Sequence, residues 1–163
     1  PDYPDTPLYQ NRDKSILTVR TFSKIYGLAG LRLGYGVGDR EIISAMHRAR
    51  HPFNTSSVAQ EAAIAALDDH EHVKRSRDVN REGLRYLIDE LGGLGISYTP
   101  TYTNFILIDL GKDPMPLYNA LLREGVIVRP VGGYGLKTHL RVTIGLPEEN
   151  ERFIKAMKKV AGK

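Results

Sequence analysis

A lysine, two hydroxyl side chains and an arginine lie close together near the start of this sequence, at Lys24, Thr21, Ser23 and Arg32. A lysine amine shielded from water can lose its proton and attack a carbonyl carbon, forming a Schiff base. A guanidinium group and two hydroxyls can hold a phosphate. A lone lysine after a strand is more often a solvated surface charge, so this pattern by itself is only a weak indication of an anion pocket with a reactive amine.

The neighbouring residues predict a strand, a turn and a second strand that would bring these side chains together. Residues 15–20 are β-branched and apolar enough for a strand, which delivers Thr21 to its C-terminal end. Gly27 and Gly30 allow the backbone to turn sharply. Residues 31–37 read as the second strand, with glycines where another backbone or a ligand approaches closely.

The whole string over residues 21–35, T-F-S-K-x-x-G-L-A-G-L-R-x-G-Y, resembles the cofactor-lysine segment of fold-type I pyridoxal-phosphate aminotransferases. It is most similar to the histidinol-phosphate aminotransferase family, and the resemblance continues to the C-terminus. It implies that Lys24 carries pyridoxal 5′-phosphate on its amine. It also implies that Ser23 and Arg32 bind the cofactor phosphate, with Thr21 a further candidate.

Two arginines in the last third of the chain extend this resemblance. The segment Leu-Arg-Val-Thr-Ile-Gly at 140–145 resembles the one that holds the substrate-binding arginine of these enzymes, which implies a carboxylate-binding role for Arg141. Arg129 matches an arginine that the histidinol-phosphate family uses for the substrate phosphate. Asn104 is a weaker candidate on the substrate side. On spacing alone, each arginine would more often be a surface charge at a strand end.

Composition and charge exclude several other classes of protein. The 163 residues are 41% hydrophobic and 26% charged, which is typical of a globular chain. A net charge of +4 suits a protein that handles phosphates and carboxylates, but does not argue for nucleic acid. There is no cysteine, no apolar run long enough for a membrane span, and no metal-ligand spacing among the five histidines. We expect a cytoplasmic protein without a metal site.

The periodicity predicts an α/β chain, and the resemblance implies that it is the C-terminal part of a fold-type I transferase. Residues 1–70 would be a remnant of the large cofactor-binding α/β domain, and residues 71–163 a small α+β domain. Asp39 is expected to cap a helix to residue 50, and Ser57 with Gln60 to cap an alanine-rich helix. The remaining expected elements are helices at 71–91, 114–124 and from 147 onward, and strands at 96–98, 103–110, 126–129 and 139–143. A flexible connector is expected at 132–135.

The resemblance implies a transamination in histidine biosynthesis, between histidinol phosphate and 2-oxoglutarate or glutamate, by a homodimeric parent enzyme. Lys24 would move a proton between the substrate carbon and the cofactor C4′. Alternatives of the same fold are a threonine-phosphate decarboxylase, an aromatic aminotransferase, or an inactive isolated domain. Because members of the family carry their lysine past the middle of a longer chain, we expect this sequence to be a fragment with little activity of its own. We also expect its first strand to leave apolar surface exposed.

Overall fold

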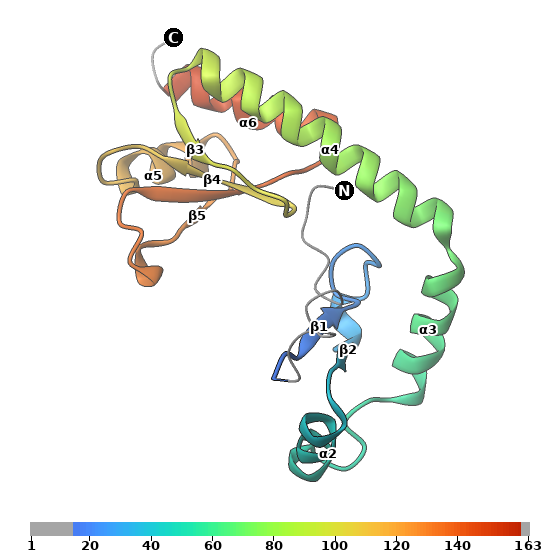
Figure 1. Cartoon of the computed structure of the whole chain (residues 1–163). Coiled ribbons are helices and arrows are strands. Elements are labelled where there is room, and N and C mark those ends of the chain that lie inside the picture. The colour runs from blue at the N-terminus through green and yellow to red at the C-terminus, as the bar shows by residue number, and fades with distance from the viewer. Residues whose placement is uncertain (1–14, 161–163) are drawn as a thin grey trace. The chain divides into compact units, whose positions relative to one another are not determined.

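The computed structural model describes residues 15–160. Residues 1–14, which the sequence indicates to be a loop, lie outside the described residues. The described residues form two compact units that divide between residues 76 and 77, inside a long helix. The expected domain boundary between residues 70 and 71 stays a prediction. Assigning the units to a large and a small aminotransferase domain stays a prediction. In chain order the elements are β1 (Thr18–Thr21), η1 (Ala29–Leu31), β2 (Gly34–Val37), α2 (Arg40–Ala49), α3 (Ser57–Asp68), α4 (His70–Gly93), β3 (Ser97–Thr99), β4 (Phe105–Asp109), α5 (Met115–Arg123), β5 (Arg129–Pro130), η2 (Gly132–Tyr134), β6 (His139–Thr143) and α6 (Pro147–Val160) (Figure 1).

The first unit contains the predicted strand–turn–strand. β1 and β2 pair antiparallel, with Thr21 opposite Gly34. A Cβ at Gly34 would lie 2.6 Å from the main-chain oxygen of Arg20, so only glycine allows this approach of the two strands. The expectation that a glycine here marks a close backbone contact is therefore confirmed.

The two helices of the first unit begin at side-chain caps. The carboxylate of Asp39 accepts a hydrogen bond from the main-chain N–H of Glu41 at 3.0 Å, which confirms the predicted cap of α2. The cap of α3 was predicted one residue too late. Ser56, in extended conformation, accepts from the N–H of Ala59, whereas Ser57 is already the first helical residue. Two adjacent serines make this choice ambiguous in the sequence.

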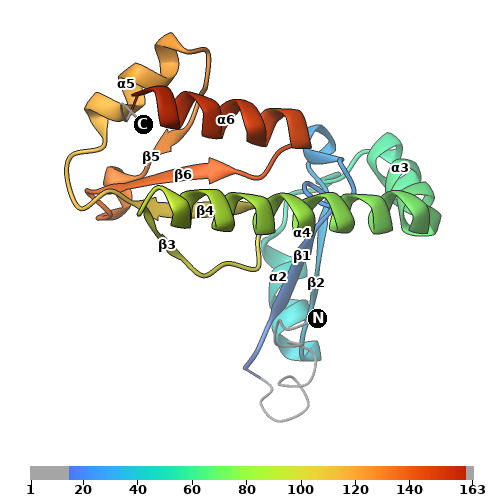
Figure 2. The same cartoon turned by 90° about the horizontal axis from the view of Figure 1, so that it is seen from above.

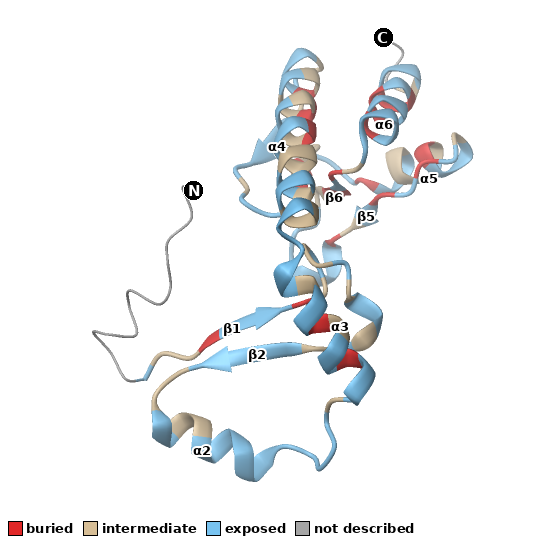
Figure 3. Ribbon diagram, turned by 90° about the vertical axis from the view of Figure 1, so that its right-hand side faces the viewer, coloured by how far each residue is buried: buried red, intermediate tan, exposed pale blue. Residues whose placement is uncertain are grey.

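Much of the first unit's apolar surface is open (Figure 3). On α3 the buried residues are Ala59 and Ala63. In the strand pair, Val19, Tyr35 and Val37 are 64%, 51% and 48% exposed. The expectation of exposed apolar surface around the first strand is thus confirmed.

The second unit is built on a four-stranded antiparallel sheet with the order β3-β4-β6-β5. Strand residues alternate between two faces. Ile106 and Ile108 of β4, with Leu140 and Val142 of β6, form the buried face. The other face therefore carries Phe105 and Arg141.

Three helices contribute to the core on the buried face. Side chains of α4, α5 and α6 join the strand residues in one hydrophobic cluster, among them Leu87, Leu91, Leu121, Phe153, Ile154 and Met157. Figure 2 shows the helices and the sheet of this cluster from above. A 2.6 Å ion pair between Lys158 and Glu90 also joins α6 to α4.

Two predictions for the second unit were wrong in detail. The strand expected at 126–129 pairs only at Arg129–Pro130. Gly125 at φ +72 and the hydrogen bond from the N–H of Val126 to the oxygen of Leu121 still belong to the end of α5. The glycine-rich segment is not a plain connector, because residues 132–134 form a 3₁₀ turn. Within residues 15–160, no helix has the length and apolarity needed to cross a membrane.

Candidate active-site residues

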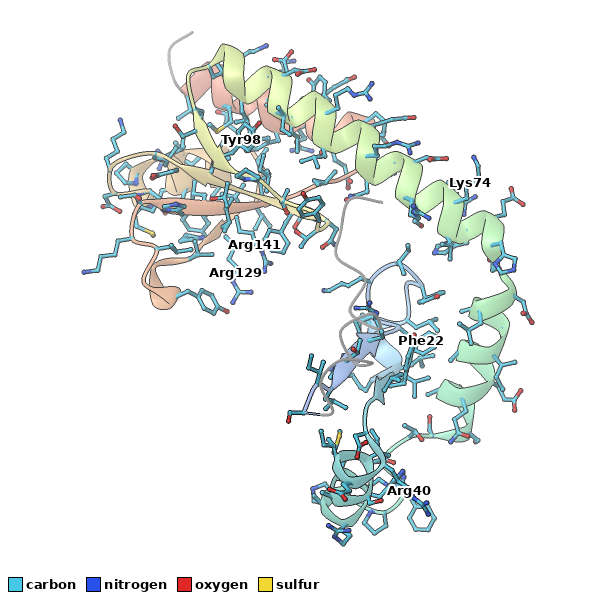
Figure 4. The ribbon with its side chains drawn as sticks, in the orientation of Figure 1. Phe22, Arg40, Lys74, Tyr98, Arg129 and Arg141 are labelled. Atoms are coloured by element: carbon cyan, nitrogen blue, oxygen red, sulfur yellow. The ribbon has the colours of Figure 1, made fainter. Side chains whose placement is uncertain are left out.

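The turn after β1 holds Lys24 on a well-bonded backbone. The N–H of Gly27 donates to the oxygen of Lys24 at 2.9 Å, and the N–H of Leu28 donates to the oxygen of Phe22 at 3.0 Å. The Phe22 ring is only 5% exposed and lies 5.0 Å from the ring centroid of Tyr26. Phe22 thus anchors the turn, a role that sequence analysis missed although the residue stands in the motif (Figure 4).

Thr21 and Ser23 form a hydroxyl pair beside the lysine. The Thr21 hydroxyl accepts from the main-chain N–H of Ser23 at 3.0 Å and donates to the Ser23 Oγ at 2.8 Å. Since the Ser23 Oγ is an acceptor in this pair, its own O–H remains available as a donor. The pair can therefore present a hydroxyl proton to an anion.

Arg32 lies at the end of η1 in a left-handed conformation, with φ +56. A non-glycine residue in this region costs of order 1 kcal/mol and needs support from its surroundings. One guanidinium nitrogen of Arg32 donates to the oxygen of Ala29 at 2.8 Å. A guanidinium has five N–H groups, so others remain for an anion.

Lys24 is exposed, and its amine makes no hydrogen bond or ion pair with another described residue. The first unit thus presents one primary amine, two hydroxyls and one guanidinium along a single turn. This donor set suits a compound with both a carbonyl group and a phosphate, as in pyridoxal 5′-phosphate.

A histidine that sequence analysis considered only as a metal ligand supports the same turn. The Nε2 of His72, in the first turns of α4, lies 2.9 Å from the main-chain oxygen of Ile25, the residue after Lys24. In the part of the chain that the structure describes, no group of three or more potential metal ligands is found.

The second unit brings Arg129 and Arg141 together. They are direct partners in the β5–β6 register, and residues opposite one another in an antiparallel pair share a face. Figure 4 shows both on the side of the sheet away from α6. Two like charges placed opposite one another are unfavourable unless an anion joins them. Among residues 15–160, neither guanidinium has a carboxylate within ion-pair distance.

Arg141 also has an unsatisfied donor. Its Nε is buried and has no hydrogen-bond partner among the described residues. Its guanidinium carbon lies 5.2 Å from the ring centroid of Phe105. A buried donor left unpaired costs about 1–3 kcal/mol, so this nitrogen is poised for an acceptor that a ligand would bring.

Asn104 lies just before β4 and is exposed, and its main-chain oxygen accepts from the N–H of Ile144 at 3.0 Å. This bond fixes its backbone beside the end of β6. The structure thus gathers Thr21, Ser23, Lys24 and Arg32 in the first unit, and Arg129 and Arg141 in the second. Each set is described within its own unit.

The comparisons with known proteins identify the class. The sequence profile for aminotransferase class I and II matches residues 3–157, and the chain belongs to this family. Members of the family depend on pyridoxal phosphate. The fold is that of the C-terminal half of fold-type I aminotransferase structures.

More particularly, the chain is 52% identical over 159 residues to histidinol-phosphate aminotransferase 2 of Pseudomonas aeruginosa. The match covers 98% of this chain and 43% of that relative, so the chain spans less than half of the relative's length. A second relative, the histidinol-phosphate aminotransferase of Symbiobacterium thermophilum, is 49% identical over 91% of this chain and 41% of its own length.

Solved structures extend the comparison. The histidinol-phosphate aminotransferase of Clostridium acetobutylicum has a TM-score of 0.91 at 26% identity, over 97% of this chain and 49% of that one. The histidinol-phosphate aminotransferase of Sinorhizobium meliloti, solved with pyridoxal-5′-phosphate, has a TM-score of 0.82 at 28% identity, and the match covers 90% of this chain and 41% of that one. The L-threonine-O-3-phosphate decarboxylase of Porphyromonas gingivalis has a TM-score of 0.81 at 26% identity, and the match covers 96% of this chain and 50% of that one.

Proposed function

We propose that this chain supplies the amine and the substrate-binding arginines of a pyridoxal-phosphate enzyme that transaminates histidinol phosphate with 2-oxoglutarate or glutamate. The observation that carries the proposal is the turn with Lys24, Ser23 and Arg32, in a chain 52% identical to a histidinol-phosphate aminotransferase. Such substrates are water-soluble metabolites, which supports a cytoplasmic reaction. We also propose a homodimeric enzyme, on the resemblance alone.

In the proposed site, the cofactor phosphate is held by the O–H of Ser23 and by the guanidinium of Arg32, and Thr21 contributes by donating its hydroxyl proton to the Ser23 Oγ. The left-handed backbone of Arg32 and the bond from its guanidinium to Ala29 limit the rotation of the side chain, so less entropy is lost on binding. When bound, pyridoxal phosphate withdraws electrons from the carbon that carries the substrate's amino group.

Lys24 has two roles in this proposal. With pyridoxal phosphate bound, the Nζ of Lys24 would be the amine that holds the aldehyde carbon of the cofactor, with loss of water. When free, the same Nζ would carry a proton to and from the substrate carbon. Both roles need a neutral primary amine at this place, because a guanidinium would remain protonated.

Arg141 and Arg129 bind the anionic groups of the substrates in this proposal. The guanidinium fork of Arg141 can make two parallel hydrogen bonds to a carboxylate, and its unpaired Nε gains an acceptor. Arg129, directly opposite, is assigned to the phosphate of histidinol phosphate. The exposed amide of Asn104 is a further substrate contact.

A threonine-phosphate decarboxylase is the second candidate, favoured by the TM-score of 0.81 to the Porphyromonas gingivalis enzyme. Transamination and decarboxylation would use the same lysine and phosphate-binding residues. The decarboxylase, however, breaks the bond between the substrate's amino-bearing carbon and its carboxyl carbon. An aromatic aminotransferase would not need two anion-binding arginines, so the pair at 129 and 141 does not favour it. Release of carbon dioxide, as against formation of glutamate, separates the first two.

The direct test is a chimera in which this chain replaces the aligned segment of the Pseudomonas aeruginosa relative. We expect it to transaminate histidinol phosphate and to lose that activity in Lys24→Ala and in the charge-conserving control Lys24→Arg. A folded chimera that binds the cofactor yet releases carbon dioxide from threonine phosphate, or makes no glutamate, would overturn the proposal.

The chain of 163 residues gives a readout without turnover. After mixing with pyridoxal phosphate and reduction with borohydride, peptide mapping should find the pyridoxyl group on Lys24 in preference to the other lysines. We expect this chain alone to bind the cofactor weakly, because the turn supplies only a phosphate site and an amine. Uniform labelling of the surface lysines would contradict the assignment of Lys24.

A further inference from the structure

Arg129 has an aromatic partner that the proposed function does not use. A guanidinium nitrogen of Arg129 donates to the hydroxyl of Tyr134 at 3.4 Å, and its guanidinium carbon lies 5.9 Å from the centroid of that ring. Both contacts are at the long end of their ranges, so neither fully satisfies the guanidinium. Tyr134 is 72% exposed, so packing does not explain its place.

The turn that carries Tyr134 is nevertheless held firmly. The N–H of Tyr134 donates to the oxygen of Val131 at 3.0 Å, and Gly135, in the left-handed region at φ +84, donates to Gly132 at 3.0 Å. Val131 is 5% exposed and donates to the oxygen of His139 on β6. The tyrosine backbone is therefore fixed relative to the strands that bear both arginines.

A tyrosine holds an arginine in a different way from a carboxylate. A carboxylate would neutralise the guanidinium, whereas a ring and a neutral hydroxyl leave its full positive charge for an incoming anion. A ring stacked on the guanidinium face also leaves the N–H groups at its edge free. Arg141 has a ring contact with Phe105, although this ring carries no hydroxyl. Each of the two opposed arginines thus has an aromatic companion and no described acidic one.

We propose that Tyr134 is a positioning residue that holds the Arg129 guanidinium for the distal phosphate of a phosphate-monoester substrate. The Tyr134 hydroxyl, which accepts from Arg129, can give its own proton to one phosphate oxygen. The assignment rests on the proposed function, since it takes Arg129 as the phosphate ligand. It adds a residue that selects a phosphate over a smaller, singly charged anion.

The test uses the whole 163-residue chain and the NMR signals of the arginine Nε–Hε groups, assigned with Arg129→Lys and Arg141→Lys. Glycerol 3-phosphate is the phosphate-monoester probe and acetate the singly charged one. In the wild-type chain, we expect glycerol 3-phosphate to shift the Arg129 signal and acetate to shift only that of Arg141. Tyr134→Phe should raise the Kd for glycerol 3-phosphate about threefold, and Tyr134→Ala about tenfold, with the acetate response unchanged.

Tyr98→Ala is the matched control, because Tyr98 lies on β3, at the edge of the sheet opposite β5, and should leave every Kd unchanged. If Tyr134→Ala binds glycerol 3-phosphate as the wild type does, the role of Tyr134 is refuted while the proposed function stands. If the probe shifts neither arginine in the wild-type chain, the assignment of the arginines falls, and with it both proposals. In the chimera, Tyr134→Ala should raise KM for histidinol phosphate about tenfold and change kcat less than twofold.

Discussion

The Nε2 of His72 lies 2.9 Å from the main-chain oxygen of Ile25, so the first turns of α4 are bonded to the turn that presents Lys24. A carbonyl oxygen only accepts, so the Nε2 of His72 carries the hydrogen. The hydroxyl of Ser76, one helical turn further on, lies 3.4 Å from the same nitrogen. Because the Ile25 oxygen takes this hydrogen, the bond to Ile25 holds the imidazole beside the residue that follows the proposed reactive lysine, and Ser76 adds only a weak contact.

His72→Ala should loosen the lysine turn without unfolding the chain. One hydrogen bond is worth about 1 kcal/mol, so the amides of Gly27 and Leu28 should exchange about fivefold faster. Hydrogen exchange followed by NMR measures this. His70→Ala is the control, since His70 is exposed on the same helix. Equal exchange rates in the two variants would mean that the His72 bond contributes nothing to the turn.

Arg141→Lys should damage substrate binding more than cofactor binding. Lysine cannot make the two parallel hydrogen bonds of a guanidinium, and a charged hydrogen bond is worth ~1.5–3 kcal/mol. KM for glutamate in the chimera should therefore rise by about 10-fold to 150-fold. The affinity for pyridoxal phosphate, followed by its absorbance, should stay within about twofold. If Arg141→Lys instead lost affinity for pyridoxal phosphate and kept its affinity for glutamate, the assignment of Arg141 to the substrate would be wrong.

The sequence predicted the elements of the fold well where a local signal was strong. The long helix expected at 71–91 spans His70–Gly93, and β6 has the predicted bounds, 139–143. The sequence predicted element boundaries poorly where neighbouring residues are of the same chemical type. Ser56 and Ser57 are equally good caps by type, and only the backbone conformation decides between them. Val126 and Val128 are buried as a strand would require, yet they follow the end of α5 without a strand partner.

The sequence predicts the candidate site residues from one long motif and two arginines, and the structure shows hydrogen bonds or ring contacts for several of them. No local pattern predicts that Arg129 and Arg141 are opposite one another, because the register of β5 and β6 depends on the turn between them. His72 and Tyr134 were also beyond prediction. Each acts through a contact with a residue whose position is set only by the fold.

Gly83, in the middle of α4, is a packing residue. A Cβ at this position would lie 2.7 Å from the Nδ2 of Asn150 and 2.7 Å from the Cγ2 of Ile144. Asn150 cannot easily move, because its amide exchanges two 2.9 Å hydrogen bonds with the backbone of Gly145. The glycine therefore lets α4 approach the start of α6.

Gly83→Ala should destabilise the second unit by about 1–2 kcal/mol. The better helix propensity of alanine, worth about 1 kcal/mol, is outweighed by overpacking and by distortion of the Asn150 bonds. Gly92→Ala is the matched control, because nothing lies within 4 Å of a Cβ there, and it should be neutral or stabilising. Hydrogen exchange of the β4 amides gives both values. A stable Gly83→Ala variant would show that the loop before α6 can shift.

Asp109 is bonded in a way that favours its charged form. Its pKa is lowered from the ordinary value of 3.8, first by a hydrogen bond from the Thr138 hydroxyl, then by the N–H of Gly111 and the charge of His139. The Gly111 bond measures 2.9 Å, and His139 is the cross-strand partner of Asp109. In the interval between the two pKa values the unfolded chain binds more protons than the folded one, so stability rises with pH. The contribution is complete above pH 3.8 and is lost as pH falls through the folded-state pKa.

Thr138→Val should therefore raise the pKa of Asp109 toward 3.8, because it removes the largest of the three causes. The carboxyl carbon shift of Asp109, followed by NMR through an acid titration, measures the pKa directly. Thr143→Val, on the same strand pair but without a bond to Asp109, should leave the titration unchanged. The variant Thr138→Val should also lose less stability than the wild type on acidification, since less of its stability depends on the charged carboxylate. An unchanged Asp109 titration in Thr138→Val would assign the lowered pKa to Gly111 and His139 instead.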